Sequence, residues 1–273
     1  MNIVCIGAHP DDCECFAGGT CLRWASEGHR VLFVSTTNGD AGHHVMGGGP
    51  LAQRRALEAR ASAEIGGIHE LILPNHDGEL EPTLELRKEM VRIIRRWEAD
   101  IVITHRPYDY HPDHRYTSVA VQDAAFMVTV PHFCPEMPRL ERNPVFLYMA
   151  DSFTKPVPFR ADIAVDISEV VETKLDMLDA MESQMYEWLP WLENQVDSVP
   201  TERSARRQWL AKAWEPFSQR LTDLSQDALR SWYGEQTAKA VVHAEPFEIC
   251  EYGNQPSKEE LRRLFPFFPA RRK

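Results

Sequence analysis

The chain has 273 residues, of which 43% are hydrophobic and 26% are charged, and its formal net charge at pH 7 is −11. This composition is typical of a folded globular protein and excludes a disordered or fibrous chain, while the negative charge argues against a nucleic-acid partner. No apolar run reaches the roughly 18 residues of a membrane span and no basic, then apolar, leader opens the sequence, so we expect a cytoplasmic protein.

The first half of the sequence alternates between short apolar runs, which are typical of buried strands, and longer helical patterns. The predicted order is a strand at 2–7, a helix from 16 to a stop at Gly28, a strand at 30–37, a helix at 50–66, a strand within 69–80, a helix at 83–99 and a strand at 100–105. This alternation predicts an α/β fold with a Rossmann-like, mostly parallel sheet and helices on both faces.

The second half of the chain is predicted to complete the sheet and to add an elaborated helical C-terminal part. A helix is expected from about 115 to 130, strands at 144–151 and 161–168, one helix over 168–189 and a closing strand at 246–252. We interpret the polar, tryptophan-rich stretch 190–235 as a helical insertion within a single domain that spans residues 1–273.

The six cysteines are expected to be free thiols. Four of them crowd into the first 21 residues, around a predicted strand-to-helix turn, which favours a reducing compartment over a disulfide framework. Cys13 and Cys15 could form half of a thiolate metal site, but no matching pair follows downstream.

Two clusters of histidines and carboxylates follow the first and the fourth predicted strands. The first contains His9, Asp11, Asp12 and Glu14, and the second lies within residues 105–114. Ligands of open parallel sheets bind outside the carboxyl ends of the strands, near the point where the strand order reverses. If these two strands are neighbours, the clusters face each other across one crevice.

The two clusters offer the donors of a catalytic zinc ion, which takes three histidine or carboxylate ligands and leaves a position for water. His9 and Asp12 can supply two ligands, and His111 or His114 must supply the third. Zinc lowers the pKa of its water towards about 7, a spare carboxylate can act as general base, and a spare histidine can stabilise an oxyanion. An acid here could instead only cap the next helix, but the concentration of these groups at two strand ends favours a metal site.

The motifs around these residues resemble those of the PIG-L/LmbE-like family of zinc-dependent de-N-acetylases. AHPDDCE at 8–14 and HPDH at 111–114 are similar to the paired family motifs, and each follows a predicted strand. RALEARASAEIGG at 55–67 resembles the Arg-x-x-Glu helix of the family, and NGDAG, KLDMLDAMESQ and AEPFEICEYG resemble further segments. The resemblance covers most of the chain except about residues 190–235.

Carried over to this sequence, the resemblance implies roles for six residues. The implied ligands of zinc, or of another divalent transition metal, are His9, Asp12 and His114. Asp11 would be the general base, His111 would stabilise the oxyanion or act as acid, and Asp113 would orient a histidine. The implied reaction removes an acetyl group from an amino sugar of the N-acetylglucosamine type or from its conjugate.

Further residues are candidates for binding such a substrate. Arg55 and Arg106 could bind sugar hydroxyls or an anionic group, Asp40 could accept hydrogen bonds from hydroxyls, and Tyr110 could contact the sugar. For Arg55 the alternative is an ion pair with Glu58 or another nearby acid. Tryptophans stack well on sugar rings, but at helical spacing they more often belong to a core, and this applies to Trp188, Trp191, Trp209 and Trp214.

Three other functions are conceivable for this sequence, and a homo-oligomer is compatible with it. A dinucleotide-dependent oxidoreductase is disfavoured, because His9 stands where the glycine-rich turn of that class should be. A zinc-dependent hydratase or lyase could use the same scaffold, although the pair Asp11 and Asp12 suits hydrolysis. A metal- or sugar-binding module without turnover is the non-enzymatic alternative.

Overall fold

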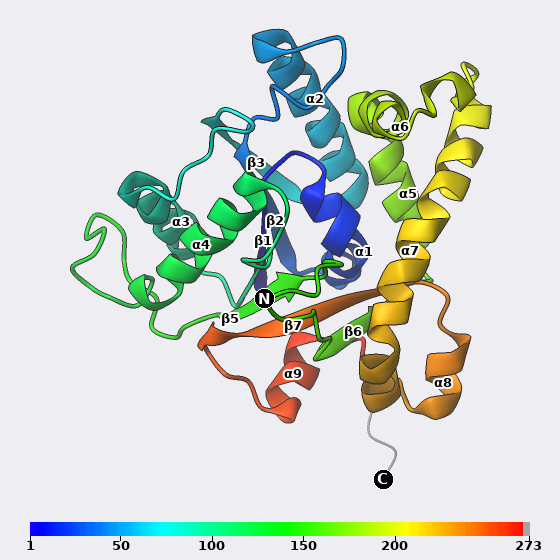
Figure 1. Cartoon of the computed structure of the whole chain (residues 1–273). Coiled ribbons are helices and arrows are strands. Elements are labelled where there is room, and N and C mark those ends of the chain that lie inside the picture. The colour runs from blue at the N-terminus through cyan, green and yellow to red at the C-terminus, as the bar shows by residue number, and fades with distance from the viewer. Residues whose placement is uncertain (270–273) are drawn as a thin grey trace.

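Seven strands form one mixed sheet at the centre of the computed structural model, which describes residues 1–269 (Figure 1). Five neighbouring strands are parallel, and the last strand of the chain, β7, runs antiparallel to both of its neighbours, β5 and β6. In sheet order the strands are β3 (His69–Asn75), β2 (Arg30–Thr37), β1 (Asn2–Gly7), β4 (Ile101–Thr104), β5 (Val145–Met149), β7 (Ala244–Gly253) and β6 (Ile163–Asp166). The predicted Rossmann-like, mostly parallel sheet is confirmed.

Helices cover both faces of this sheet because successive strand residues point to opposite sides. On one face Ile3, Cys5 and Phe33 pack against α1, α7 and α9, and on the other Val4 and Ile6 pack against α3 and α4. The helices are α1 (Asp12–Ser26), α2 (Gly48–Gly66), α3 (Leu84–Arg96), α4 (Pro112–Met127), α5 (Val171–Asp179), α6 (Leu189–Leu192), α7 (Arg203–Tyr233), α8 (Glu235–Ala240) and α9 (Lys258–Leu264). None of the helices in residues 1–269 has the length and apolar character that a membrane crossing requires.

The single helix predicted over 168–189 is wrong, because the structure divides it into three pieces. α5 ends at Asp179, a π-helical turn follows at Ser183–Trp188, and α6 comes next. The break has a partner outside the helix. Glu58 of α2 accepts a hydrogen bond from the backbone N–H of Ser183 at 3.0 Å. This N–H thus has a side-chain acceptor at the point where the regular α-helix gives way to the π-helical turn.

α3 begins at a side-chain cap that offers a simple test of local stability. The hydroxyl of Thr83 accepts a hydrogen bond from the backbone N–H of Leu86 at 3.2 Å. We expect Thr83→Ala to lower the free energy of unfolding by about 1 kcal/mol, because a helix N–H loses its acceptor. Urea denaturation measures this change, and Thr83→Ser, which keeps the oxygen, is the control. Equal stability of the alanine and serine variants would contradict the assignment of the cap.

α1 is joined to the C-terminal half of the chain by a buried ion pair between Lys174 of α5 and Glu245 of β7. The ammonium group of Lys174 donates to Glu245 Oε1 and to the carbonyl of Cys15, each at 2.7 Å. The same carboxylate accepts from the backbone N–H of Gly19 at 2.8 Å and from that of Thr20 at 2.6 Å. Five buried polar groups of three elements are thus satisfied together.

The apolar end of the chain packs on its own domain. Phe265 is fully buried and its ring centroid lies 5.0 Å from that of Trp24 in α1, whose indole N–H donates to the carbonyl of Leu264 at 2.8 Å. Phe268 belongs to the same core cluster. All six cysteines are also buried and free, as the sequence predicts.

Candidate metal centre and active site

The two motif loops meet at one edge of the sheet because β1 and β4 are adjacent and parallel. The loop after β1 leads into α1, and the loop after β4 leads into α4, so the first turns of both helices lie at the same edge (Figure 1). The strand order reverses between these two strands, as it does in doubly wound sheets that bind ligands at this point. The expected crevice location is therefore where the structure places both clusters.

Asp12 is the most firmly held side chain of the site. Its Oδ2 accepts hydrogen bonds from the backbone N–H groups of Ala8 and His9, both at 2.8 Å, and lies 3.2 Å from His105 Nε2. This packing requires a glycine at position 7, since a Cβ there would lie 2.6 Å from Cβ of Asp12. Burial alone raises the pKa of the carboxyl, but His114 and His105 hold this pKa well below its usual range.

Asp12 lies close to each of the other two implied metal ligands, His9 and His114. Asp12 Oδ1 is 3.4 Å from His114 Nε2, and Asp12 Oδ2 is 3.5 Å from His9 Nδ1. Two atoms that each lie about 2.1 Å from one zinc ion are at most about 4.2 Å apart, so both distances fit a common ion. The histidines whose donor atoms all lie within 4.8 Å of one another are His9, His111 and His114, a set that contains His111 in place of Asp12. The donors present therefore fit a divalent transition metal.

Each of two histidines of the cluster has an acidic side chain beside it. His114 Nδ1 lies 3.1 Å from Asp109 Oδ2, which leaves Nε2 directed at Asp12. His9 Nε2 lies 3.2 Å from Asp113 Oδ2, and Asp113 is completely buried. A carboxylate behind a ligating histidine fixes its ring and raises its basicity. The geometry of Asp113 thus suits the orienting role that the resemblance implies.

Asp77 and His105 also lie at this centre: Asp77 was not predicted, and His105 begins the second predicted cluster without an assigned role. Asp77 Oδ1 lies 3.2 Å from His9 Nε2, and the ring of His105 stacks on that of His114 with centroids 4.1 Å apart. Their donor atoms form two further groups with metal-binding spacing, His9–Asp77–His111–Asp113 and Asp12–His105–His114. Asp77 follows the end of β3, so the strand-end rule that selected the two motifs could have found it.

Asp11 lies beside the metal cluster in a strained backbone conformation. Its φ of 153° and ψ of −25° lie outside the regions that a non-glycine residue favours, and such strain concentrates at functional sites. Its carboxylate is 3.3 Å from Nη2 of Arg55. Burial raises the pKa of Asp11 to about 6, and Arg55 only partly offsets this rise. A carboxyl with such a pKa can take up and release a proton near neutral pH.

His111 is the N-cap of α4, and this fixes its free nitrogen. Its Nδ1 accepts a hydrogen bond from the backbone N–H of Asp113 at 3.2 Å, so in the neutral ring the proton sits on Nε2. Burial and the neighbouring His9 and His114 lower the pKa of His111. The ring lies 4.6 Å from that of His9, between centroids. His111 therefore presents a neutral N–H donor next to the metal cluster.

Arg55 is buried within the protein rather than exposed to a substrate. It donates to the carbonyls of Pro10 at 2.9 Å and Gly39 at 3.1 Å, and its acidic partner is Asp11. The alternative pair with Glu58 is not formed, because the neighbouring Arg54 takes that carboxylate at 3.0 Å. Arg55 thus ties the loop after β1 to the loop after β2.

The other three candidates for substrate binding differ in their accessibility. Asp40 is buried and its carboxylate is engaged by His76 Nδ1 at 2.6 Å. Arg106 is buried and lies 3.1 Å from Asp151. Tyr110 is 70% exposed, and its ring centroid is 5.7 Å from that of His111. Tyr110 is therefore the exposed candidate beside His111, whereas Asp40 and Arg106 are buried and already paired with groups of the protein.

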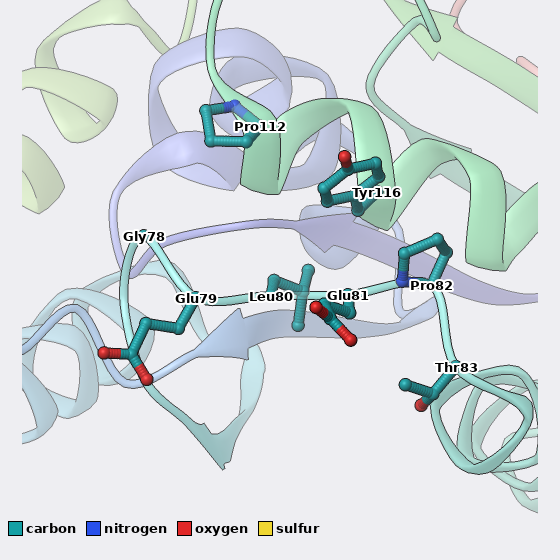
Figure 2. Close-up of a pocket in the computed structure, with 8 residues that line it drawn as sticks. All are labelled: Gly78, Glu79, Leu80, Glu81, Pro82, Thr83, Pro112 and Tyr116. Atoms are coloured by element: carbon teal, nitrogen blue, oxygen red, sulfur yellow. The ribbon is translucent and has the colours of Figure 1, made fainter.

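A shallow pocket of about 430 Å³ lies next to this centre (Figure 2). Figure 2 shows residues 78–83 running past Pro112 and Tyr116 of α4. The pocket is bordered by the segment that Asp113 holds in place, since its carboxylate accepts from the N–H groups of Gly78 at 2.7 Å and Leu80 at 3.2 Å. None of the implied metal ligands lines the pocket, so it is not itself the metal centre.

Comparison with known proteins identifies the family. The family model described as "PIG-L: GlcNAc-PI de-N-acetylase" matches residues 4–125, which include both motifs. The diacetylchitobiose deacetylase of Thermococcus kodakarensis is 33% identical over 206 residues, which cover 70% of this chain and 74% of that protein. The chain belongs to the PIG-L family.

Proteins with different named activities are similar to this PIG-L family member. A probable N-acetyl-α-D-glucosaminyl L-malate deacetylase 2 of Bacillus anthracis is 26% identical over 227 residues, or 79% of this chain and 93% of that protein. The solved structure of the 4-carboxy-2-hydroxymuconate hydratase of Pseudomonas putida has a TM-score of 0.71 at 18% identity, with 94% and 99% of the two chains covered. At that identity the likeness concerns the fold alone.

Proposed function

We propose that this PIG-L family protein is a metal-dependent hydrolase that removes the acetyl group from an N-acetylglucosamine unit. The observation that carries the proposal is the group of His9, Asp12 and His114 with the carboxylate of Asp11 beside it, at the switch point of the sheet. The 33% identity to a diacetylchitobiose deacetylase supports the choice of reaction and of sugar.

His9, Asp12 and His114 would hold the metal ion. Zinc suits a set of two imidazoles and one carboxylate, and Asp113 and Asp109 behind the histidines favour their binding. The ion, when bound, supplies positive charge that polarises an acyl carbonyl and makes water a better nucleophile. The remaining chemistry falls to the side chains around it.

Asp11 and His111 are suited to the two proton-dependent roles in amide hydrolysis. Asp11 accepts the proton of the attacking water on its carboxylate, and because its pKa is about 6 it can pass this proton to the departing amine. His111 donates from Nε2 to the carbonyl oxygen while negative charge builds on it. The products are acetate and a free amino sugar.

The sugar is expected to lie between Tyr110 and the loop that carries Asp77. Tyr110 is the exposed member of the candidate set, and Asp77 is an acceptor for sugar hydroxyls beside His9. Burial raises the pKa of Asp77, but His9 and Arg55 lower it to about 2, so this residue is ionised. Arg55, Asp40 and Arg106 are proposed to act by holding the loops around the sugar.

Metal removal tests the function. We expect chelation to abolish acetate release from N,N'-diacetylchitobiose, and one equivalent of zinc to restore it and to raise the melting temperature, because the ion binds the folded state. In the His114→Ala variant, added zinc should change neither acetate release nor the melting temperature. Protein prepared without chelator that holds no stoichiometric divalent ion, and gains no activity from added metal, would refute the proposal.

The product distinguishes the rival functions. A hydratase would add water to an alkene acid and release no acetate from any acetylated sugar. A binding module would hold metal and sugar, and the Asp11→Asn variant would then have no activity to lose.

A further inference from the structure

Four aromatic rings form a stacked column between the loop after β2 and the segment around α6. The column runs in the order His43, His44, Trp191 and Trp188. Successive centroids are 4.7 Å, 5.3 Å and 5.3 Å apart, and the interplanar angles are 24°, 9° and 13°. Near-parallel rings at these distances attract one another, so each holds the next in place.

Polar contacts fix the column at both sides. Glu187, next to Trp188, lies 2.7 Å from His43 Nε2 and accepts two hydrogen bonds from the guanidinium of Arg54 at 2.8 and 2.6 Å. Gln184 donates to the carbonyl of Gly42 at 3.1 Å. The rings are therefore preorganised, which lowers the entropic cost of binding a ligand against them.

The column reaches the active site at Trp188. A Cβ on Gly42 would lie 3.6 Å from Trp188 Nε1, 3.3 Å from Asp77 Oδ2 and 3.1 Å from Arg55 Nη1, so these three side chains border the same point. Within residues 1–269, Trp188 Nε1 has no protein hydrogen-bond acceptor. Three residues around α6 are partly exposed to solvent: Leu189 by 38%, Trp191 by 44% and Leu192 by 51%. Figure 1 shows the region around α6 next to α2, at the edge of the molecule that carries the site.

The charges around the column disfavour an anionic group as its ligand. Arg54 lies 3.0 Å from Glu58 and 2.6 Å from Glu187, and Arg55 lies 3.3 Å from Asp11 and 3.8 Å from Asp77. Each guanidinium already faces two carboxylates of the protein. A phosphate or carboxylate brought to this wall would meet compensated cations and nearby acids, whereas an uncharged ring meets no such repulsion.

We propose that the aromatic column is a subsite for a second, uncharged pyranose ring, linked to the N-acetylglucosamine unit that undergoes deacetylation. The apolar face of a pyranose packs on the face of Trp188 that Trp191 does not cover, and the free N–H of Trp188 can donate to a sugar oxygen. This inference rests on the proposed function and deepens it: the preferred substrate is a neutral disaccharide rather than a monosaccharide or an anionic conjugate.

Steady-state kinetics on three probes test this preference: N,N'-diacetylchitobiose, N-acetylglucosamine and N-acetylglucosaminyl malate. We expect the wild type to show the highest kcat/KM with the disaccharide. Trp188→Ala should lower the ratio of kcat/KM for disaccharide to monosaccharide about tenfold, mainly through KM, because the stacking contact with the sugar is lost. Trp191→Ala should lower this ratio less, because it removes only the ring that supports Trp188. Trp97→Ala, at the residue that follows α3 and outside the column, is the matched control and should leave this ratio unchanged.

Trp188→Phe guards against a folding defect, since it keeps an aromatic face and should retain most of the ratio at an unchanged melting temperature. Ratios in both alanine variants equal to the wild-type ratio, or a preference for the malate conjugate, would overturn the inference. Calorimetric measurement of disaccharide and monosaccharide binding to the Asp11→Asn protein separates failure of this inference from failure of the proposed function. If no sugar releases acetate, tighter binding of disaccharide than of monosaccharide, lost in Trp188→Ala, still supports the subsite, and equal binding refutes it.

Discussion

Replacing Asp11 with asparagine is expected to lower kcat for acetate release by about 10³-fold while metal content stays at the wild-type level. The amide has nearly the shape of the carboxylate but cannot accept the proton of the attacking water, and general-base catalysis contributes 10²–10⁴-fold. Asp11 is not among the three proposed ligands, so the metal cluster keeps its donors. Single-turnover acetate release and metal analysis on the same preparation measure both quantities.

The control for this prediction is the same substitution at the opposite edge of the sheet. Asp100 precedes β4, is exposed, and accepts a hydrogen bond from the backbone N–H of Asn2 at 2.8 Å. Asp100→Asn should change kcat by less than about twofold, because surface substitutions away from a site have small effects. An Asp11→Asn protein that keeps more than a tenth of the wild-type kcat would show that another group takes the proton.

Replacing Lys174 with methionine is expected to lower the free energy of unfolding by about 3–5 kcal/mol, the usual cost of leaving one member of a buried ion pair uncompensated. Glu245 is completely buried and would keep its charge beside α1 without the ammonium group. The carbonyl of Cys15 would lose a hydrogen-bond donor as well. Denaturation by guanidinium chloride, monitored by tryptophan fluorescence, gives the change.

A double variant separates the charge effect from the loss of packing. Lys174→Met combined with Glu245→Gln removes both charges and keeps most of the side-chain volume, so it should be more stable than the single Lys174→Met variant. If the double variant is less stable by the full sum of the two single changes, the two residues do not interact and the pair does not act as a unit.

The parallel part of the fold could be predicted from local patterns because each strand there is followed by a helix. β1 to β4 and α1 to α3 follow from apolar runs of the right length and from helix stops. That β1 lies beside β4 was assumed from the usual doubly wound strand order, and the structure shows this pairing. The position of β7 between β5 and β6 could not be predicted in this way. A strand's own residues do not state which distant strand it pairs with, or in which direction.

The site illustrates the same limit on a smaller scale. His9 and Asp12 could be selected because dense motifs follow two strands, and the family resemblance chose His114 over His111. Asp77 also follows a strand, but as a single acid it does not form a dense motif. For Arg55, sequence spacing pointed to Glu58, but residues four apart face each other better on a helix, and Arg54 takes that partner. The actual partner, Asp11, is distant in sequence and becomes a neighbour only in the folded chain.

The contact of Trp24 with the end of α9 bears on the order of events during synthesis. The indole N–H of Trp24 bonds to a carbonyl 240 residues later in the chain, and Phe265 covers the same ring. At 5–20 residues per second the ribosome takes roughly 12–48 s to make that stretch. Throughout this interval the apolar face of α1, the helix that starts at Asp12, lacks its final cover. The nascent chain therefore offers a hydrophobic surface to chaperones before its catalytic edge can take its final form.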